Sequence, residues 1–170
     1  MKVSLVQLNG AFNGLATKIK KFREYYRESL GYPEVRSYAE EAAGRGPRII
    51  QAGRMFQTIR EKVNYVADPE PFHRKGSLVG VEYTKAPWQM VKEIKERGFS
   101  AGDCDDQASL SYSLLKSAGI PAVMRVVWYG GEEPKHIYCL AMLDGKWIAF
   151  DTTQDIMGKE RGFTRAEDFQ

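Results

Sequence analysis

The chain has 170 residues, of which 43% are hydrophobic, and a formal net charge of +3. This is enough for one domain with a hydrophobic core, and the charge is too small to indicate nucleic-acid binding by itself. Two cysteines cannot form a disulfide framework, and the sequence contains neither a signal-peptide core nor an apolar run long enough to span a membrane. We therefore expect a soluble protein with reduced thiols.

Positive charge is concentrated at the start of the chain. Residues 1–62 hold 12 basic and 6 acidic residues, a net charge of +6, whereas residues 63–170 hold 13 and 16, a net charge of −3. The simpler interpretation is a solvated helical face, and the alternative is a docking surface for an acidic protein partner. Basic and aromatic residues do not alternate, so we expect no nucleic acid among the partners. We also expect no membrane, because no apolar run approaches the length of a membrane span.

The first half of the chain predicts helices. The segment VSLVQL indicates a short strand at residues 3–8, and apolar residues then recur at helical spacing over residues 15–30. The breaks GYP and GRGP delimit a second helix over residues 33–43. A longer apolar stripe over residues 49–66 predicts the main core helix of this half.

The second half turns from helices to strands. Residues 68–87 are rich in turn formers, and Pro87 suits the first turn of a helix that ends at Gly98. A further helix is expected to begin at Cys104 and to end at Gly119. Val, Ile and aromatic residues then dominate three strand-like runs: VMRVVWYG, HIYCLAML and KWIAFDTT. This order predicts an α+β fold, with N-terminal helices packed on a C-terminal antiparallel sheet.

One of the two cysteines lies at a predicted helix start. In GDCDD, Asp103 is a good N-cap, and Asp106, three residues later, completes a capping-box pattern. Cys104 then occupies the first turn, where unpaired N–H groups and the helix dipole favour a thiolate. The neighbouring carboxylates oppose this effect. Taken alone, Cys104 fits an inert cysteine equally well, so its interpretation depends on the residues that meet it.

The last two strands predict which side chains share a face. The dipeptide DG between them is a strong signal for a two-residue hairpin turn, which sets the pairing of the flanking strands. With this register His136 and Asp151 are diagonal neighbours on one face, within reach of an imidazole–carboxylate contact. Cys139 points to the opposite, apolar face and is expected to be a core thiol. A Cys–His–Asp constellation forms if the cysteine-bearing helix packs its start against the face that bears the histidine.

The sequence shows no metal or cofactor pattern. The two histidines, His73 and His136, are not at metal-ligand spacing. The acidic residues around Cys104 match neither a zinc pattern nor an EF-hand loop, so capping and turn roles are expected for them. The chain also has no phosphate-binding glycine loop. We therefore expect no cofactor and no metal.

Three separated motifs agree in type, order and spacing with one enzyme family. GDCDDQASLSYSLLKSAGIPAVMRVV has a Gly-x-Cys at a helix start, and HIYCLAMLDGKWIAFDTT has a His strand followed by a Trp-containing strand that ends in Asp-x-Thr. The chain thereby resembles the transglutaminase-like superfamily, a branch of the papain-like thiol enzymes. Upstream, IREKVNYVADPEP and KAPWQMVKEIKERGFSAGDCDD are similar to its bacterial and phage-encoded branch. The resemblance covers residues 56–153 most closely and implies a papain/transglutaminase-like core with the nucleophile at a helix N-terminus.

The resemblance implies a role for each residue that matches the family pattern. Cys104 would be the nucleophile, His136 the general base and acid, and Asp151 the group that orients the histidine. The backbone N–H of Cys104 is the natural oxyanion donor. For a second donor the resemblance points to Trp88, with Gln89 as the alternative, although helix packing is the simpler role for both.

Residues around this predicted triad are candidates for the substrate groove. Tyr138 and Trp147 share the histidine face of the hairpin, where they would line the groove or pack in the core. The loop before the histidine carries Glu132, Glu133 and Lys135, which would border the site.

The resemblance implies a cysteine acyl-transfer enzyme that hydrolyses peptide or amide bonds through an acyl-thioester, with a protein or peptide as substrate. The alternative is a phage or bacterial assembly module that uses the same fold to bind protein, with little or no turnover and with the basic N-terminal helices as its docking surface. We expect one domain over residues 1–170, made of a helical lead-in (1–47), a catalytic core (48–153) and a C-terminal extension (154–170). The expected location is the cytoplasm of a bacterial host. The alternative is a phage-encoded or virion-associated protein.

Overall fold

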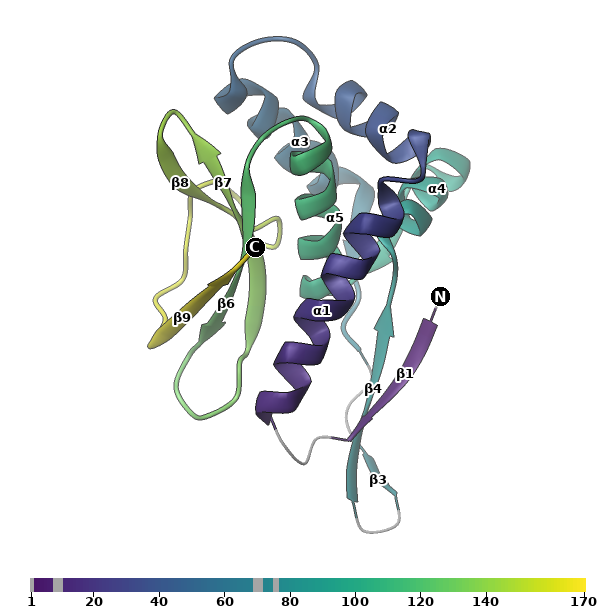
Figure 1. The fold of residues 1–170 in the computed structure, drawn as a ribbon, viewed down its shortest axis with the longest axis vertical. Coiled ribbons are helices and arrows are strands. Elements are labelled where there is room, and N and C mark those ends of the chain that lie inside the picture. The colour runs from purple at the N-terminus through teal and green to yellow at the C-terminus, as the bar shows by residue number, and fades with distance from the viewer. Residues whose placement is uncertain (1, 8–10, 69–71, 75–76) are drawn as a thin grey trace.

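The computed structural model describes the backbone of residues 2–7, 11–68, 72–74 and 77–170, and the side chains of residues 19–68 and 84–170. Figure 1 shows one helix, α5 (Cys104–Ser117), in the middle of the molecule, with a four-stranded sheet on one side of it. Other helices pack around α5: α1 (Ala11–Ser29), α2 (Pro33–Ala43), α3 (Arg48–Lys62) and α4 (Pro87–Arg97). The α+β fold is confirmed. Among the described residues, every helix is too short or too polar to cross a bilayer.

The strands of the described residues form three sheets. The central sheet is antiparallel, in the order β8-β7-β6-β9. Its strands are β6 (Ala122–Trp128), β7 (His136–Leu143), β8 (Lys146–Phe150) and β9 (Arg165–Phe169). A short parallel pair joins β2 (Val63–Tyr65), which follows α3, to β5 (Ser100–Gly102), which lies just before α5 in the chain. A separate antiparallel sheet extends away from the helices in Figure 1 and consists of β1 (Lys2–Gln7), β4 (Ser77–Thr84) and β3 (Phe72–Arg74).

The central helix α5 is buried along most of its length. Residues 105–115 are all buried, and the small side chains among them let the sheet and the other helices approach closely. Asp103 caps the N-terminus, since its carboxylate accepts hydrogen bonds from the N–H groups of Asp105 and Asp106. Gly119, with φ of +73°, lies in the left-handed turn that follows the helix. The predicted N-cap and stop are therefore confirmed.

The main N-terminal core helix is shorter than the apolar stripe predicts. Ala52, Met55 and Ile59 are buried on α3, as expected. Val63–Tyr65, however, pair with β5 as a strand instead of continuing the helix, and Val66 is 56% exposed. The apolar stripe extends beyond the end of the helix because Val63 is also buried. Val63, however, belongs to a strand whose partner lies far along the chain.

The hairpin between β7 and β8 has the predicted register. Leu143 pairs with Lys146, and the ladder continues to the pair of Cys139 and Phe150. The two turn residues have φ of 49° and 77°, as this type of two-residue turn requires. Cys139 is completely buried on the apolar face, so the prediction of a core thiol is confirmed.

The last strand, β9, was not predicted from the sequence. Its residues RAEDF pair antiparallel with β6, so part of the segment after residue 153 is an edge strand of the central sheet. Arg125 of β6 binds Asp168 of β9 through two hydrogen bonds of 2.7 and 2.8 Å. An edge strand of this kind carries polar and charged residues, and the alternating apolar pattern that identifies a half-buried strand is therefore missing.

Candidate active site

The first turn of α5 presents Cys104 near the surface. Cys104 is partly exposed, whereas the residues that follow it in the helix are buried. It follows the N-cap Asp103 directly, so the N–H groups of the first turn and the positive end of the helix dipole lie beside its thiol. Such a position favours a thiolate and offers backbone donors to an oxyanion. Neither cysteine takes part in a disulfide.

Asp106 lies beneath the start of α5 and anchors the segments around it. Its carboxyl group accepts hydrogen bonds from the backbone N–H groups of Lys85, at 2.8 Å, and of Asp103. Burial raises the pKa of Asp106 to about 7, and the charge of Asp105 adds to this effect. A Cβ at Gly102 would lie 2.5 Å from an oxygen of Asp106. The glycine of the Gly-x-Cys pattern therefore has a steric cause.

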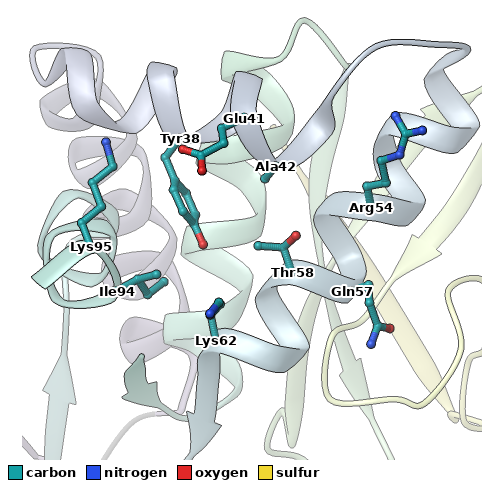
Figure 2. Close-up of a pocket in the computed structure, with 9 residues that line it drawn as sticks. All are labelled: Tyr38, Glu41, Ala42, Arg54, Gln57, Thr58, Lys62, Ile94 and Lys95. Carbon is teal, nitrogen blue, oxygen red and sulfur yellow. The ribbon is translucent and has the colours of Figure 1, made fainter. Parts of the chain in front are cut away.

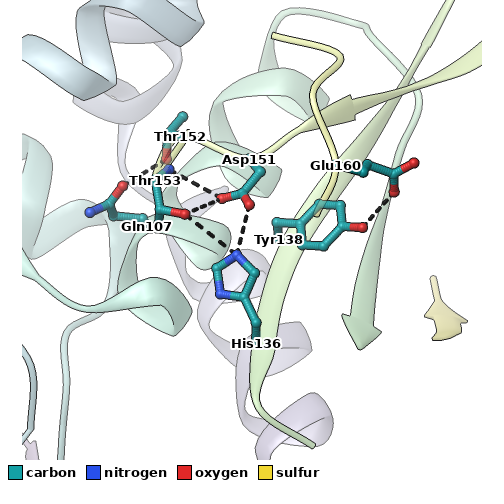
Figure 3. A network of polar contacts seen from close by, with 7 residues as sticks. All are labelled: Gln107, His136, Tyr138, Asp151, Thr152, Thr153 and Glu160. Atoms are coloured by element: carbon teal, nitrogen blue, oxygen red, sulfur yellow. Dashed lines mark hydrogen bonds and ion pairs between the residues drawn. The ribbon is translucent and has the colours of Figure 1, made fainter. Parts of the chain in front are cut away.

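His136 and Asp151 are in contact, as the hairpin register predicts (Figure 3). The Nε2 of His136 donates to Oδ2 of Asp151, and the two atoms are 2.7 Å apart. Thr153 holds the other carboxylate oxygen, because its backbone N–H and its hydroxyl donate to Oδ1 at 3.1 and 2.7 Å. The carboxylate is thus fixed toward the imidazole, whose Nδ1 faces away from it.

These contacts determine the charge of Asp151. Burial by itself would raise its pKa, but the hydrogen bond and charge of His136, together with the hydrogen bonds from Thr153, lower the pKa below its ordinary value. The carboxylate is therefore ionised at neutral pH. An ionised carboxylate in this position stabilises the protonated form of its histidine partner.

Cys104 and Asp151 line the same narrow crevice between α5 and the chain that follows β8. Thr153 and Gln107 form other parts of its wall. Gln107 lies one turn after Cys104, and its Oε1 accepts a hydrogen bond of 2.8 Å from the buried hydroxyl of Thr152. This bond ties the helix start to the segment that carries Asp151. Sequence reasoning missed the bond because its two residues lie 45 positions apart.

The body of α5 packs on the face of the sheet opposite to that of His136. The Sγ of Cys139 donates to the backbone oxygen of Ala108 at 3.2 Å, which places the middle of α5 on the apolar face. Cys104 shares its crevice with Asp151 and with Tyr138, whose ring lies beside that of His136. The helix start is therefore next to the carboxylate that binds the histidine. Burial also raises the pKa of the Cys139 thiol, which keeps it protonated and inert.

Tyr138 packs beside His136, with their ring centroids 5.5 Å apart. Its side chain is buried, and its hydroxyl donates to Oε1 of Glu160 at 2.5 Å. Arg125 donates to the same oxygen at 3.0 Å. Burial and the bond to Glu160 raise the pKa of Tyr138 well above its ordinary value. This chain of contacts fastens the segment before β9 to the strand that carries the histidine.

A second hollow, of about 380 Å³, opens beside His136. Its lining comes from segments far apart in the sequence: Tyr65, Tyr129, Lys135, His136, Thr153, Gln154 and Arg161. Of the loop residues predicted to border the site, Lys135 lines this hollow, and Glu133 lies 3.8 Å from the Lys135 ammonium. The backbone oxygen of Glu132 accepts a hydrogen bond from Trp128.

Trp88, Gln89 and Trp147 have other surroundings. The indole N–H of Trp88 donates to Glu28 at 3.3 Å, and its ring stacks on Tyr32 with centroids 4.6 Å apart. These contacts join α4 to the chain around the end of α1. Gln89 caps the start of its own helix. Trp147 is 44% exposed on β8 and lines neither the crevice nor the hollow. Helix packing thus accounts for Trp88, and capping of its own helix accounts for Gln89.

The acidic residues at the start of α5 lie close enough together to face a single cation. Oxygen atoms of Asp103, Asp105 and Asp106 lie within 4.8 Å of one another. Two of these side chains already accept backbone hydrogen bonds, so capping accounts for their grouping. The side chain of His73, for which no metal role was expected, lies outside the described side chains.

A larger cavity, of about 650 Å³, lies between α2, α3 and α4 (Figure 2). It is lined by Tyr38, Glu41, Ala42, Arg54, Gln57, Thr58, Lys62, Ile94 and Lys95. It has no thiol or imidazole in its wall, so its size does not make it a catalytic site. It belongs to the basic N-terminal part of the chain, where docking of a protein partner stays a prediction.

The family model of the transglutaminase-like superfamily matches residues 36–152. This segment holds the central helix and the His–Asp hairpin. The chain belongs to the transglutaminase-like superfamily. Its assignment to the bacterial and phage-encoded branch stays a prediction. No curated protein matches the chain.

Two solved structures of low sequence identity share this fold, and a third is less similar. A "putative protease" from Parabacteroides distasonis has a TM-score of 0.57 and 18% identity, over 78% of this chain and 25% of its own. A "putative cysteine protease" from Cytophaga hutchinsonii has a TM-score of 0.50 and 19% identity, over 81% of this chain and 48% of its own. A structure named as a TGase has a TM-score of 0.42 and 12% identity, over 92% of this chain and 37% of its own. The chain therefore spans less than half the length of each of these proteins.

Proposed function

We propose that the chain is a cysteine acyl-transfer enzyme that hydrolyses peptide or amide bonds, with Cys104, His136 and Asp151 as its catalytic residues. The observation that carries this proposal is the 2.7 Å contact between His136 and an ionised Asp151, beside the helix start that bears Cys104. A carboxylate bound to one ring nitrogen leaves the other nitrogen for proton transfer. Membership of the transglutaminase-like superfamily supports the same assignment.

In this reaction the thiolate of Cys104 attacks the carbonyl carbon of the amide, which forms a C–S bond and a tetrahedral oxyanion. The backbone N–H of Cys104 donates to that oxyanion. The C–N bond then breaks as protonated Nδ1 of His136 gives its proton to the leaving amine, and a thioester remains. Water gives a proton to the same nitrogen and attacks the thioester, which releases the acid and restores the thiolate.

An amine in place of water would give crosslinking instead of hydrolysis. We favour water as the acceptor because two solved structures that share the fold, with TM-scores of 0.57 and 0.50, are named as proteases. Thr153 and Gln107 act as positioning residues in this proposal. Thr153 orients the carboxylate of Asp151, and Gln107 joins the nucleophile helix to the chain next to that carboxylate.

The test is the pH dependence of Cys104 alkylation by iodoacetamide in the wild type and in His136→Ala. Peptide mapping by mass spectrometry separates labelling of Cys104 from that of Cys139. We expect fast labelling of the wild type at about pH 6, and in the variant the profile of an ordinary thiol with a pKa of about 8.5. Peptide and amide substrates are then screened for amine release that depends on Cys104.

The contrary result is an ordinary thiol profile in the wild type that does not change in His136→Ala. That result would remove the enzyme proposal and favour the alternative from the sequence, an assembly module that uses the fold to bind protein. Asp151→Asn is the intermediate variant, because it keeps the imidazole of His136 and removes only the negative charge of the carboxylate that binds it. We expect its labelling rate to lie between those of the other two proteins.

A further inference from the structure

We propose that the hollow beside His136 is an anion-binding subsite, which selects substrates that carry a carboxylate next to the amide bond that reacts. This inference rests on the proposed function and names the substrate class of the same site. It is carried by the position of two cations, Lys135 and Arg161, in the wall of a cavity that also contains the histidine.

The described wall of this hollow presents hydrogen-bond donors and positive charge. Lys135 and Arg161 are its charged residues apart from the histidine, and its two tyrosines, Tyr65 and Tyr129, add hydroxyl groups. Among the residues with described side chains, no carboxylate lines the hollow. A carboxylate is the group that such a set of donors binds best, because hydrogen bonds between charged partners are about twice as strong as neutral ones.

Three carboxylates near the cations of this wall are engaged by other groups, whereas Asp103, Asp105 and Asp68 act on its Tyr65 side. Asp151 is bound by His136 and Thr153, and Glu160 is bound by Tyr138 and Arg125. Glu133 lies 3.8 Å from the ammonium of Lys135, but both side chains are more than half exposed. Exposed pairs of this kind contribute little free energy, so Lys135 remains available to a carboxylate of the substrate.

Arg161 is placed at the hollow by the chain segment that leads into β9. The backbone N–H of Thr164 donates to the oxygen of Trp128 at 2.8 Å, and the N–H of Gly130 donates to the Thr164 hydroxyl at 3.0 Å. The guanidinium of Arg161 lies 5.7 Å from the ring centre of Tyr129. Arg161 lies outside residues 36–152, the part that matches the family, so the family match does not account for its place at the hollow.

The hollow adjoins the crevice that contains the nucleophile. Thr153 lines both of them, so the crevice with Cys104 lies next to the hollow with Lys135 and Arg161. Burial and charge on Cys104 both raise the pKa of the two tyrosines in the wall of the hollow. A substrate amide at Cys104 would therefore place a neighbouring carboxylate close to the two cations.

The experiment compares two alkylating agents of nearly equal size, iodoacetate and iodoacetamide, at low ionic strength. The ratio of their rates at Cys104 is measured in the wild type, in Arg161→Gln and in Lys135→Gln. Arg36→Gln is the matched control, because it removes the same charge from an exposed position on α2. We expect each cavity variant to lower the iodoacetate-to-iodoacetamide ratio about fivefold, as the loss of one charge a few ångströms away implies.

Two further observations belong to the same experiment. The preference for iodoacetate falls as salt is added, because exposed charges are screened, and Arg36→Gln keeps the ratio of the wild type. A ratio that is equal in the wild type, both cavity variants and the control overturns the subsite. Failure of the proposed function would be seen in a different measurement. That proposal predicts fast alkylation by iodoacetamide and the loss of this fast rate in His136→Ala, whatever the ratio between the two agents.

A second arm identifies the source of the carboxylate. N-acetyl-glutamic acid α-amide carries it on a side chain, and N-acetyl-glutamine carries it at the C-terminus; N-acetyl-glutamine amide is the neutral reference. We expect at least one of the two acids to protect Cys104 from iodoacetamide more than the neutral compound does, and Arg161→Gln to abolish the difference. Equal protection by all three compounds in the wild type also overturns the subsite.

Discussion

Replacing Asp106 by Asn removes a titratable group from beneath the start of α5 while preserving its shape. The side chain is 2% exposed, and its pKa is about 7 in the folded protein, compared with an ordinary value of 3.8. A raised pKa means that the folded protein holds the proton more tightly than the unfolded chain. The contribution of Asp106 to stability is therefore complete below about pH 4 and is lost as the pH rises through about 7.

The two pKa values of Asp106 set the magnitude of the effect. Their difference corresponds to ~4 kcal/mol in the free energy of unfolding. An Asn side chain resembles the protonated carboxyl, since its Oδ1 can still accept the hydrogen bond from Lys85, and it has no charge to desolvate. We expect Asp106→Asn to exceed the wild type in stability by less than ~1 kcal/mol at pH 4, by ~3 kcal/mol at pH 6 and by ~4 kcal/mol at pH 8.

The assay for this prediction is urea denaturation of both proteins across this pH range, with linear extrapolation to water. All other titratable groups are common to the two proteins, so the difference between their free energies of unfolding isolates Asp106. Asp144→Asn is the control, because it makes the same chemical change in the exposed hairpin turn. A difference for Asp106→Asn that is independent of pH, or that falls as the pH rises, would refute the reasoning.

Three other predictions concern the same region. Gly102→Ala places a Cβ 2.5 Å from a buried carboxyl oxygen and should lower the free energy of unfolding by ~1–3 kcal/mol. The control is Gly53→Ala in α3, where a Cβ would have no atom within 4 Å, and it should raise the free energy of unfolding by ~0.5–1 kcal/mol. Similar effects of the two substitutions in urea denaturation would contradict the steric explanation. The pKa of Asp151 is lowered in the folded protein, so the stability advantage of the wild type over Asp151→Asn should be complete above about pH 4 and should shrink as the pH falls. Urea denaturation at pH 6 and pH 3 checks this, and an advantage that grows in acid would be inconsistent with it. The native chain should react with one iodoacetamide, at Cys104, because burial both shields Cys139 and raises the pKa of its thiol. Intact-mass spectrometry should detect a second label only after unfolding. Two labels on the native chain would exclude this explanation.

The sequence by itself determined the features that depend on neighbouring residues. Asp103 was predicted as the N-cap of α5 because a side chain two or three positions before an N–H group can reach it. The DG turn determined the register of the hairpin, and the alternation of side chains along a strand then placed His136 and Asp151 together and Cys139 on the opposite face. Cap, turn and alternation operate over a few residues, so a single sequence is enough to identify them.

Tertiary structure alone decided how distant segments meet. The stripe of α3 could not reveal where the helix ends, because Val63–Tyr65 become a strand only through pairing with β5. The bond from Thr152 to Gln107 and the position of Arg161 beside His136 likewise join segments with no shared local pattern. Such contacts depend on which surfaces pack together, and local periodicity carries no information about that. The sequence therefore identified the candidate catalytic residues, whereas the packing of the chain created the hollow that we propose as a substrate subsite.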